Sequence, residues 1–311
     1  MSEKTLDISI VIPTYNEEKT IASKLDDIYN LNFPKENLEI IIVDCSTDNT
    51  PIIVKTFFET RPEIKHIFFH EDKRKGVAHS MNIGRVMSSG EIILRTDADS
   101  KLEENCLTYI LKAFEDPKVG CVTGKPHPIG SSKEENYRSI GTKIQLLESK
   151  IDSTIIAHGP LTAFRKSIPF NLKEIFIADD SAINIEIRKR GYKCIIEPNA
   201  IFFEKTSTSG RDEQKIRRAS GLIKLLWINK TLFLNPFYGL YGIIVFPFNF
   251  ISTTILPLIL SPLLITMMYF NIKGGTLLET QQFCLKGIHR LLFTKKATIH
   301  WDQDKEIRQE T

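Results

Sequence analysis

The sequence lacks the charge excess and the cysteine spacing that mark several common classes of protein. Its 41 Lys and Arg residues nearly balance 38 Asp and Glu residues, and the net charge of +3 is too small to favour binding to nucleic acid. No run of basic residues interleaved with aromatic residues supports that partner either, so no nucleic acid is expected. The five cysteines show no C-x-x-C spacing and are Cys45, Cys106, Cys121, Cys194 and Cys284. This pattern argues against a disulfide framework or a zinc site and favours a reducing cytosol.

The first seven residues are polar and lack the apolar core of a signal peptide, and nothing in the chain repeats. Apolar residues make up 42% and charged residues 25% of the chain, which is typical of a folded globular protein. The length of 311 residues allows one large domain or two small ones.

Short apolar runs alternate with helical patterns in the first third of the chain. The runs contain few polar residues, as expected for strands with both faces covered, and begin at Ile8, Leu38, Ile64 and Ile92. The helical patterns between and after them reach about Asn30, open at Thr50-Pro51, end near Ser88 and run from Leu107 to Phe114. This alternation predicts an α/β fold with a mostly parallel central sheet.

The fourth apolar run ends in two aspartates, Asp97 and Asp99. Alternate side chains of an extended segment share a side, so these two carboxylates are expected to lie together at the strand end. Such a pair suits Mg²⁺ or Mn²⁺, hard divalent cations that also take phosphate oxygens as ligands. Taken alone, an Asp-x-Asp after a strand favours the alternative of an ordinary turn.

Other aspartates stand at an equivalent place in the predicted sheet. Asp44 and Asp48 follow the second strand, as Asp97 and Asp99 follow the fourth. Ligands bind at that edge of open α/β sheets, so the four residues together favour a nucleotide site, although each alone also fits a helix cap or a turn. After the third strand, the basic residues 73–75 precede Gly76, where backbone amides would approach a phosphate, but no P-loop pattern is present.

A second acidic feature, Asp179-Asp180, opens a helical pattern that ends at the basic residues 188–190 and Gly191. Acidic residues at the start of a helix and basic residues at its end match the helix dipole, and that alone accounts for the pair. Between the two acidic features, the pattern predicts a strand over 119–123, a helix over 134–150 and a turn at 158–160.

Taken together, these stretches resemble the inverting glycosyltransferases of the large family 2, which have the GT-A fold. The resemblance covers roughly residues 6 to 220, and its motifs occur in the order and spacing of that family. The motifs are residues 11–18 (VIPTYNEE), 42–48 (IVDCSTD), 90–99 (GEIILRTDAD) and 179–180 (DD) before the basic helix end.

The resemblance implies how a nucleotide-diphosphate sugar would be bound. Pro13, Tyr15 and Glu17 match positions that line the nucleotide pocket, and Asp44 matches the aspartate that hydrogen-bonds the base. Lys75, in the basic segment after the third strand, is expected among the substrate-binding residues.

The resemblance also implies the chemistry. Asp99 matches the direct ligand of a divalent cation, Mg²⁺ or Mn²⁺, and Asp97 faces the ribose and the metal. Asp180 matches the general base, the second residue of a pair that is usually Glu-Asp. Here the first residue is Asp179, which we expect to contact substrate, so its role is less sharply implied.

Residues 214–218 (QKIRR) resemble the Gln-x-x-Arg-Trp motif of processive family members. Gln214, Arg217 and Arg218 are therefore expected to bind substrate. Because Arg218 stands where the tryptophan would be, processive synthesis of a polymer is not implied.

The segment between Lys230 and Lys273 contains no charged side chain in 42 residues. Residues 251–270 have the length of a bilayer-spanning helix, and residues 232–250 suggest an interfacial or re-entrant piece. The alternative is a buried hairpin of a soluble domain, which so long an uncharged segment disfavours. Basic residues flank the segment on both sides, so we expect a helical hairpin that enters from the cytoplasmic face.

The expected organisation is a GT-A catalytic domain over 1–228, a membrane-embedded hairpin over 229–273, and an amphipathic helix with a cytoplasmic tail over 274–311. This predicts an inverting glycosyltransferase at the cell membrane, with a cytoplasmic catalytic domain and a lipid-linked or glycan acceptor. Two other functions remain open: a sugar nucleotidyltransferase, and a non-catalytic subunit that binds nucleotide sugars.

Overall fold

The structure is a computed structural model of the chain, and it describes residues 8–130, 132–173, 178–205, 211–270, 272 and 274–293. The polar N-terminal residues 1–7 and the tail after Phe293, which contains Trp301, lie outside the described residues.

The N-terminal half forms the parallel part of one sheet. Strands lie side by side in the order β3-β2-β1-β4, and all three pairs are parallel. Their bounds are β1 Ile8–Thr14, β2 Leu38–Asp44, β3 Lys65–His70 and β4 Ile92–Arg95. The connecting helices are α1 Ile21–Tyr29, η1 Lys35–Asn37, α2 Thr50–Glu59 and α3 Val77–Met87. The predicted alternation of strands and helices is confirmed here.

The second half extends the sheet with mixed directions. The order continues from β4 through β7, β6 and β8 to β5, and only β6 and β8 pair in parallel. These strands are β5 Ser100–Leu102, β6 Val119–Ile129, β7 Thr162–Arg165 and β8 Lys193–Lys205. The helices of this half are α4 Cys106–Ala113, α5 Ser132–Ile151, η2 Gly159–Leu161, α6 Asp179–Lys189 and α7 Arg211–Ile228.

Apolar side chains cover both faces of the sheet, which explains why the strands are apolar at successive positions. On one face, residues such as Ile10 and Ile42 pack against α1, α2 and α4. On the other, residues such as Val11 and Val43 belong to a cluster that extends through α3, α6 and α7. This second cluster also includes Tyr241, Val245, Phe246 and Phe250 of the uncharged segment.

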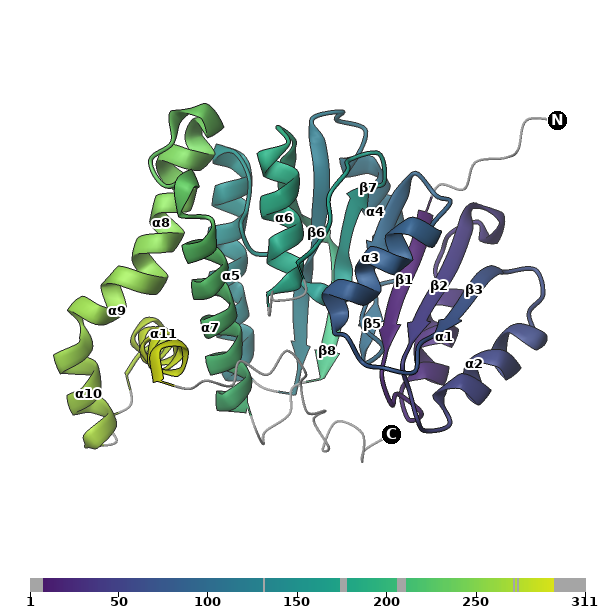
Figure 1. Ribbon diagram of the computed structural model, residues 1–311, viewed down its shortest axis with the longest axis horizontal. Coiled ribbons are helices and arrows are strands. Elements are labelled where there is room, and N and C mark those ends of the chain that lie inside the picture. Colours follow the sequence, from purple (N-terminus) through teal and green to yellow (C-terminus); the bar gives the residue numbers. More distant parts are fainter. Residues whose placement is uncertain are drawn as a thin grey trace.

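The uncharged segment differs from the expected arrangement. Among the residues that the structure describes, one helix is long and apolar enough to cross a membrane. This helix is Tyr241–Ile259. The predicted span over 251–270 does not coincide with a single helix, since α9 ends at Ile259 and α10 begins at Ser261. In Figure 1, α8, α9 and α10 follow one another down the edge of the molecule, and α11 lies between them and α7.

The helical pieces of this region begin with η3 Lys230–Leu232 and η4 Pro236–Tyr238. They continue as η5 Tyr241–Val245, α8 Phe246–Phe250, η6 Ile251–Ile255, α9 Leu256–Ile259, α10 Ser261–Tyr269 and α11 Thr276–Phe293. The two π-helical turns, η5 and η6, each end shortly before a proline, Pro247 or Pro257. A proline has no N–H for the usual helical hydrogen bond, so wider turns accommodate it without breaking the helix. The predicted helix after Gly275 is confirmed as α11.

Candidate active site

Polar side chains gather where the parallel strands end. The chain leaves β1 towards β2 and β3 on one side, whereas β4 lies on the other side of β1. Loops that leave neighbouring strands at such a reversal diverge and leave room for a ligand. The loops after β1 and β4 carry Glu17, Asp97 and Asp99, so the predicted metal and nucleotide residues meet at this edge.

The loops after β1 and β2 hold each other through short hydrogen bonds. Asn16 has a positive φ of 55° and its amide N–H donates to Ser46 Oγ at 2.8 Å. The Glu17 N–H donates to Thr50 Oγ1 at 2.8 Å, and Asp48 accepts from the Thr50 hydroxyl at 2.6 Å. Asp48 is therefore a structural residue that orients the loop containing Glu17.

Asp44 is enclosed rather than open to a ligand. Its side chain has no exposed surface, and it accepts hydrogen bonds from Thr14 Oγ1 at 2.7 Å and Ser46 Oγ at 2.5 Å. The Ser46 N–H adds a third hydrogen bond at 3.1 Å, and His70 Nδ1 lies 2.7 Å from Asp44 Oδ2. The structure thus places Asp44 at the predicted edge but buries its carboxylate beneath His70.

The basic loop after β3 reaches across to β1. The Arg74 guanidinium lies 4.0 Å from the centroid of the Tyr15 ring, close enough for a cation–π contact. Lys75 instead donates to Glu71 at 2.9 Å, and Gly76 has a φ of 95° where helix α3 begins. Pro13 is half-buried near the end of β1.

Lys24 of α1 stabilises the turn that carries Asp97 and Asp99. The Ser100 hydroxyl donates to the Asp97 carbonyl at 2.9 Å and closes the turn. Buried Lys24 donates to the Ser100 carbonyl oxygen at 2.9 Å. Burial lowers the pKa of Lys24 to about 8, against the opposing effect of Asp27, Asp97 and Asp99.

Negative charge is concentrated at the end of this turn. Burial, together with the nearby charges of Asp97, Glu17 and Glu204, raises the pKa of Asp99 to about 7. A bound cation would relieve this repulsion, and carboxylate oxygens are the donors that Mg²⁺ and Mn²⁺ prefer, so the residues fit such an ion. Among the described residues, no group of three or more acidic, His or Cys side chains forms a complete metal site. Asp97 and Asp99 would therefore need further ligands from a substrate or water.

Arg95 joins the two acidic motifs. Its buried guanidinium donates to Asp179 Oδ2 from one nitrogen and lies 3.4 Å from Asp97 Oδ1 with another. Burial opposes its charge, but Asp179, Asp97 and Asp180 together raise the pKa of Arg95 above its usual value. Burial raises the pKa of Asp179 to about 6 despite Arg95, so at neutral pH the two groups form an ion pair.

Asp180, the second acidic residue at the start of α6, contacts the backbone of Gly159. Its Oδ2 accepts a hydrogen bond from the Gly159 N–H at 3.2 Å, and the carboxylate is half-exposed. A Cβ at Gly159 would lie 2.9 Å from Asp97 Oδ2 and 2.8 Å from Arg95 Nη2, so a side chain there would displace these two groups between the acidic motifs. Helix α6 begins at Asp179, as predicted, and the structure brings Asp97, Asp179 and Asp180 together.

Helix α7 supplies positive charge next to the acidic pair. Burial lowers the pKa of Arg217 to about 10, as do Arg218 and Arg290, whereas Asp179 and Asp180 oppose the shift. Arg217 is half-buried and Arg218 is exposed on the same helix. Gln214 is half-buried one turn earlier.

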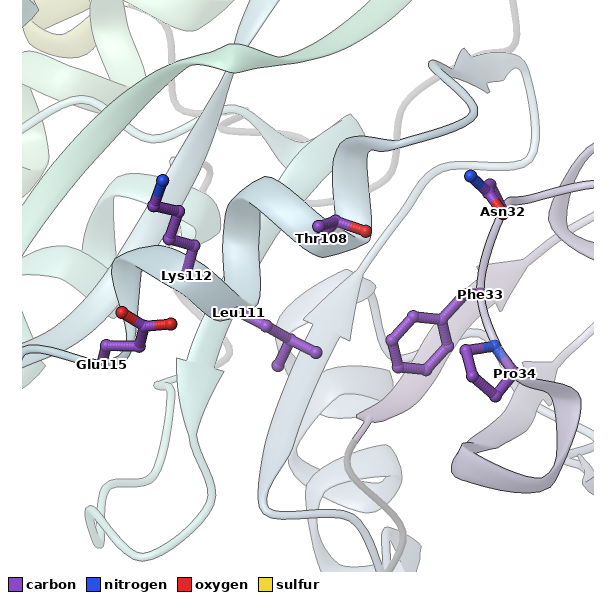
Figure 2. Close-up of a pocket in the computed structure, with 7 residues that line it drawn as sticks. All are labelled: Asn32, Phe33, Pro34, Thr108, Leu111, Lys112 and Glu115. Atoms are coloured by element: carbon purple, nitrogen blue, oxygen red, sulfur yellow. The ribbon is translucent and has the colours of Figure 1, made fainter.

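A surface depression of about 410 Å³ lies away from all of these residues, between η1 and α4. Figure 2 shows its lining, in which Phe33, Pro34 and Leu111 form an apolar floor beside Lys112 and Glu115. It contains no residue of either acidic motif, so we do not assign the chemistry to it.

Three residues of the site had no predicted role, namely Lys24, Arg95 and Gly159. Arg95 lies within the fourth strand and Gly159 within the predicted turn. Nothing in these two stretches of sequence indicates that Arg95 and Gly159 lie close together. A lysine among the apolar positions of a helix was the one available signal for Lys24, since buried lysines are rare.

Comparison with known proteins gives one consistent family. A family model described as "Glycosyl transferase family 2" matches residues 9–170. The poly-beta-1,6-N-acetyl-D-glucosamine synthase of Staphylococcus epidermidis is 28% identical over 229 residues, which cover 69% of this chain and 54% of that protein. The chain thus spans about half the length of the curated relatives it matches.

Solved structures show the same fold. The mannosyltransferase PcManGT from Pyrobaculum calidifontis, in complex with GDP-Man and Mn²⁺, superposes with a TM-score of 0.75 at 26% identity, covering 94% of this chain and 89% of that one. S. aureus TarS 1-349 in complex with UDP-GlcNAc has a TM-score of 0.52 at 16% identity, with 92% of each chain covered, a likeness of fold alone. The predicted α/β fold of the GT-A type is confirmed.

Proposed function

Because the chain belongs to glycosyl transferase family 2, we propose that it transfers a sugar from a nucleoside-diphosphate sugar to a hydroxyl group of a lipid-linked or glycan acceptor. The observation that carries the proposal is that Asp97 and Asp180 approach each other around Arg95 and Gly159 at the carboxyl edge of the sheet, with Asp99 beside Asp97. The similar mannosyltransferase with GDP-Man and Mn²⁺ supports the donor class and a divalent cation. The similar N-acetylglucosamine polymer synthase supports a glycan acceptor.

We propose that Asp99 and Asp97 would hold Mg²⁺ or Mn²⁺ together with diphosphate oxygens. When bound, the cation would neutralise charge that develops on the leaving diphosphate. Glu17, in the loop after β1, lies near Asp99, which follows β4. Lys24 stabilises the turn of Asp99 through its hydrogen bond to Ser100. Tyr15, Pro13 and Lys75 remain proposed donor contacts around the same edge.

Asp180 is the proposed general base. Its carboxylate would take the proton of the acceptor hydroxyl as that oxygen attacks the anomeric carbon from the face opposite the diphosphate. The bond to the diphosphate then breaks in the same step, and the anomeric centre inverts. Asp179 is already paired with Arg95, so we propose that it positions Arg95 and leaves Asp180 to move the proton.

The arginines of α7 are proposed to contact anionic substrate groups. Arg217 lies within the electrostatic reach of Asp179 and Asp180, next to Arg218 and Arg290. Repulsion among these like charges would be relieved by a phosphate of the donor or of a lipid-linked acceptor. Gln214 is proposed as a further substrate contact on this helix.

We propose that the uncharged segment attaches the protein to the cytoplasmic face of the cell membrane by lying in its surface. Its inner face belongs to the same apolar cluster as α6 and α7, and Asn249 donates to Glu148 of α5 at 2.6 Å. A crossing would draw these charged helices into hydrocarbon, at a high cost in free energy. The outer face is exposed and apolar, with Ile244, Phe248, Ile251, Ile255 and Leu258 at helical spacing.

This arrangement modifies the expected division of the chain. Residues 229–273 would be a membrane-attachment segment packed on the catalytic domain of 1–228, in place of an embedded hairpin. Helix α11 packs on α7 through Cys284 and Ile288, while Leu277 and Leu292 are exposed and available to lipid. Basic residues on both flanks, such as Lys230 and Lys286, favour the cytoplasmic leaflet.

Replacing Leu258 of the outer face and its exposed neighbour Ile259 by aspartate is expected to abolish binding to lipid vesicles. They are 50% and 69% exposed, and each apolar side chain contributes about 1.5–3 kcal/mol when buried. Cosedimentation with anionic vesicles should fall by about 10²-fold or more. Ile52→Asp, a 64% exposed residue of α2, is the matched control and should sediment like wild type. Vesicle binding of the double variant equal to that of wild type would rule out this surface.

The donor class is tested by thermal shift of purified protein against a panel of nucleotide sugars, with and without Mn²⁺. Binding to the native state raises the melting temperature, so at least one nucleoside-diphosphate sugar should do so in a Mn²⁺-dependent way. A panel in which none stabilises the protein, or in which Mn²⁺ has no influence, counts against the proposed function.

A further inference from the structure

Three polar side chains stand in one row across the ends of the first three strands. In the parallel register, Thr14 of β1 pairs with Asp44 of β2, and Asp44 pairs with His70 of β3. Paired residues of neighbouring strands point to the same side of the sheet. Figure 1 shows β1, β2 and β3 side by side with their ends at one edge.

Within this row, only His70 is available to a ligand. The Asp44 carboxylate has no exposed surface, and its hydrogen bonds from Thr14, Ser46 and His70 use both oxygens. The His70 side chain is 39% exposed. A group that approaches the end of β2 therefore meets the imidazole ring before it meets the carboxylate.

The contact with Asp44 also decides which ring nitrogen carries the proton. Asp44 Oδ2 is an acceptor, so His70 Nδ1, at 2.7 Å, is the nitrogen that donates to it. In a neutral imidazole, the other nitrogen, Nε2, is then an acceptor. A buried carboxylate that fixes the tautomer of an exposed histidine is a common way to prepare that ring for binding.

The loops on either side enclose the same place. Tyr15 follows β1 and Arg74 follows β3, and these two side chains meet at 4.0 Å across the end of β2. The Glu71 N–H donates to the Asp44 carbonyl at 2.8 Å, and the Cys45 N–H donates to the Thr14 carbonyl at 3.1 Å. The ends of the three strands are thus tied together at the edge that carries His70, and the loops after β1 and β3 add an aromatic ring and a planar guanidinium to this edge.

We infer that His70 reads the base of the donor nucleotide, with Nε2 accepting a hydrogen bond from a ring N–H, and that Asp44 is a positioning residue that sets the tautomer of His70. This inference rests on the proposed function and names the nucleotide class that the same site selects. Uracil and guanine carry such a ring N–H, whereas cytosine and adenine have an acceptor nitrogen at the corresponding position. The site would therefore select uridine or guanosine diphosphates over cytidine or adenosine diphosphates.

The test is calorimetric binding of UDP, GDP, CDP and ADP in the presence of Mn²⁺. Wild type is expected to bind UDP or GDP at least about 10-fold more tightly than CDP and ADP, the usual scale for one hydrogen bond with an unpaired alternative. His70→Ala should bring the four affinities to within about 3-fold of each other. His66→Ala, on the same strand and stacked on Phe58 away from the strand end, is the matched control and should keep the wild-type preference.

The role of Asp44 is tested by measuring which ring nitrogen of His70 is protonated. In protein labelled with ¹⁵N-histidine, the signal missing from His70→Ala identifies the ring, and its shifts report the tautomer. We expect a protonated Nδ1, an unprotonated Nε2, and a change in the Nε2 chemical shift when UDP or GDP is added. Protonation at Nε2 instead, or an Nε2 signal unaffected by either nucleotide, overturns it.

The outcomes separate this inference from the function on which it rests. If wild type binds all four diphosphates equally, or if His70→Ala keeps the preference, the role of His70 is wrong while the proposed transferase stands. If no diphosphate binds at all, both are wrong.

Discussion

An Asp99→Asn variant is expected to transfer sugar at least about 10³-fold more slowly than wild type. Asparagine keeps the shape of the side chain but removes the charge that would hold the cation against the leaving diphosphate. Asp99 lies in a concentration of negative charge with Asp97, Glu17 and Glu204, so the loss of its carboxylate removes the strongest reason for a cation to bind there. The measurement is release of nucleoside diphosphate as a function of Mn²⁺ concentration, with donor binding followed in parallel.

The matched control is Asp116→Asn, which changes an exposed aspartate just before the start of β6, away from the carboxyl edge. That variant should show wild-type rates and the wild-type dependence on Mn²⁺. If Asp99→Asn kept both as well, Asp99 would not be a metal ligand, and the turn that Lys24 and Ser100 support would be merely structural.

Asp180→Asn is expected to lower kcat at least about 10²-fold, the usual scale for loss of a general base. The asparagine oxygen can still accept the hydrogen bond from the Gly159 N–H, so the link between η2 and α6 is retained. Donor affinity and melting temperature should therefore stay close to those of wild type, and only the proton transfer is lost. Steady-state kinetics with a donor-binding isotherm separates these effects.

A different pattern would indicate a structural role for Asp180. If the Asn variant melts well below wild type, or fails to bind donor, then the carboxylate serves mainly the start of α6 and its contact with Gly159. Asp180→Glu gives a second comparison, because it keeps the charge but moves the carboxylate, and we expect partial activity with intact donor binding.

The parallel part of the fold was predictable because its signals are local. Stretches such as residues 40–43 are apolar at successive positions since both faces are covered, and the sheet edge follows from strand direction alone. The convergence of Asp97 and Asp99 with the acidic pair of α6 was implied by the family resemblance. The structure links Asp97 to Asp179 through Arg95, which the motif contains but does not explain.

What the sequence could not indicate depends on contacts between distant residues. The carboxylate of Asp44 pairs with His70, 26 positions later in the chain, and no periodicity predicts that pair. Gly159 reads as an ordinary turn residue, although a side chain there would meet Asp97 and Arg95.

The helix bounds and the burial of the uncharged segment could not be predicted from the sequence either. Uniform apolar composition does not set where helices begin, and the predicted span over 251–270 missed the break at Leu260. Composition also cannot reveal that 44% of an 18-residue stretch within the helix Tyr241–Ile259 is buried in the protein. The packing of Phe246 and Phe250 with α7 is a tertiary property, and it changes the expected relation of this segment to a bilayer.

The most direct test of the proposed reaction is the configuration of the first sugar released or transferred from the donor, followed by time-resolved proton NMR with Mn²⁺ present. A single displacement with Asp180 as base predicts that an α-linked donor yields the β anomer first, before any mutarotation. Release of the α anomer first would contradict the account, because retention needs a different arrangement of groups from the one that Asp97, Asp99 and Asp180 are proposed to form.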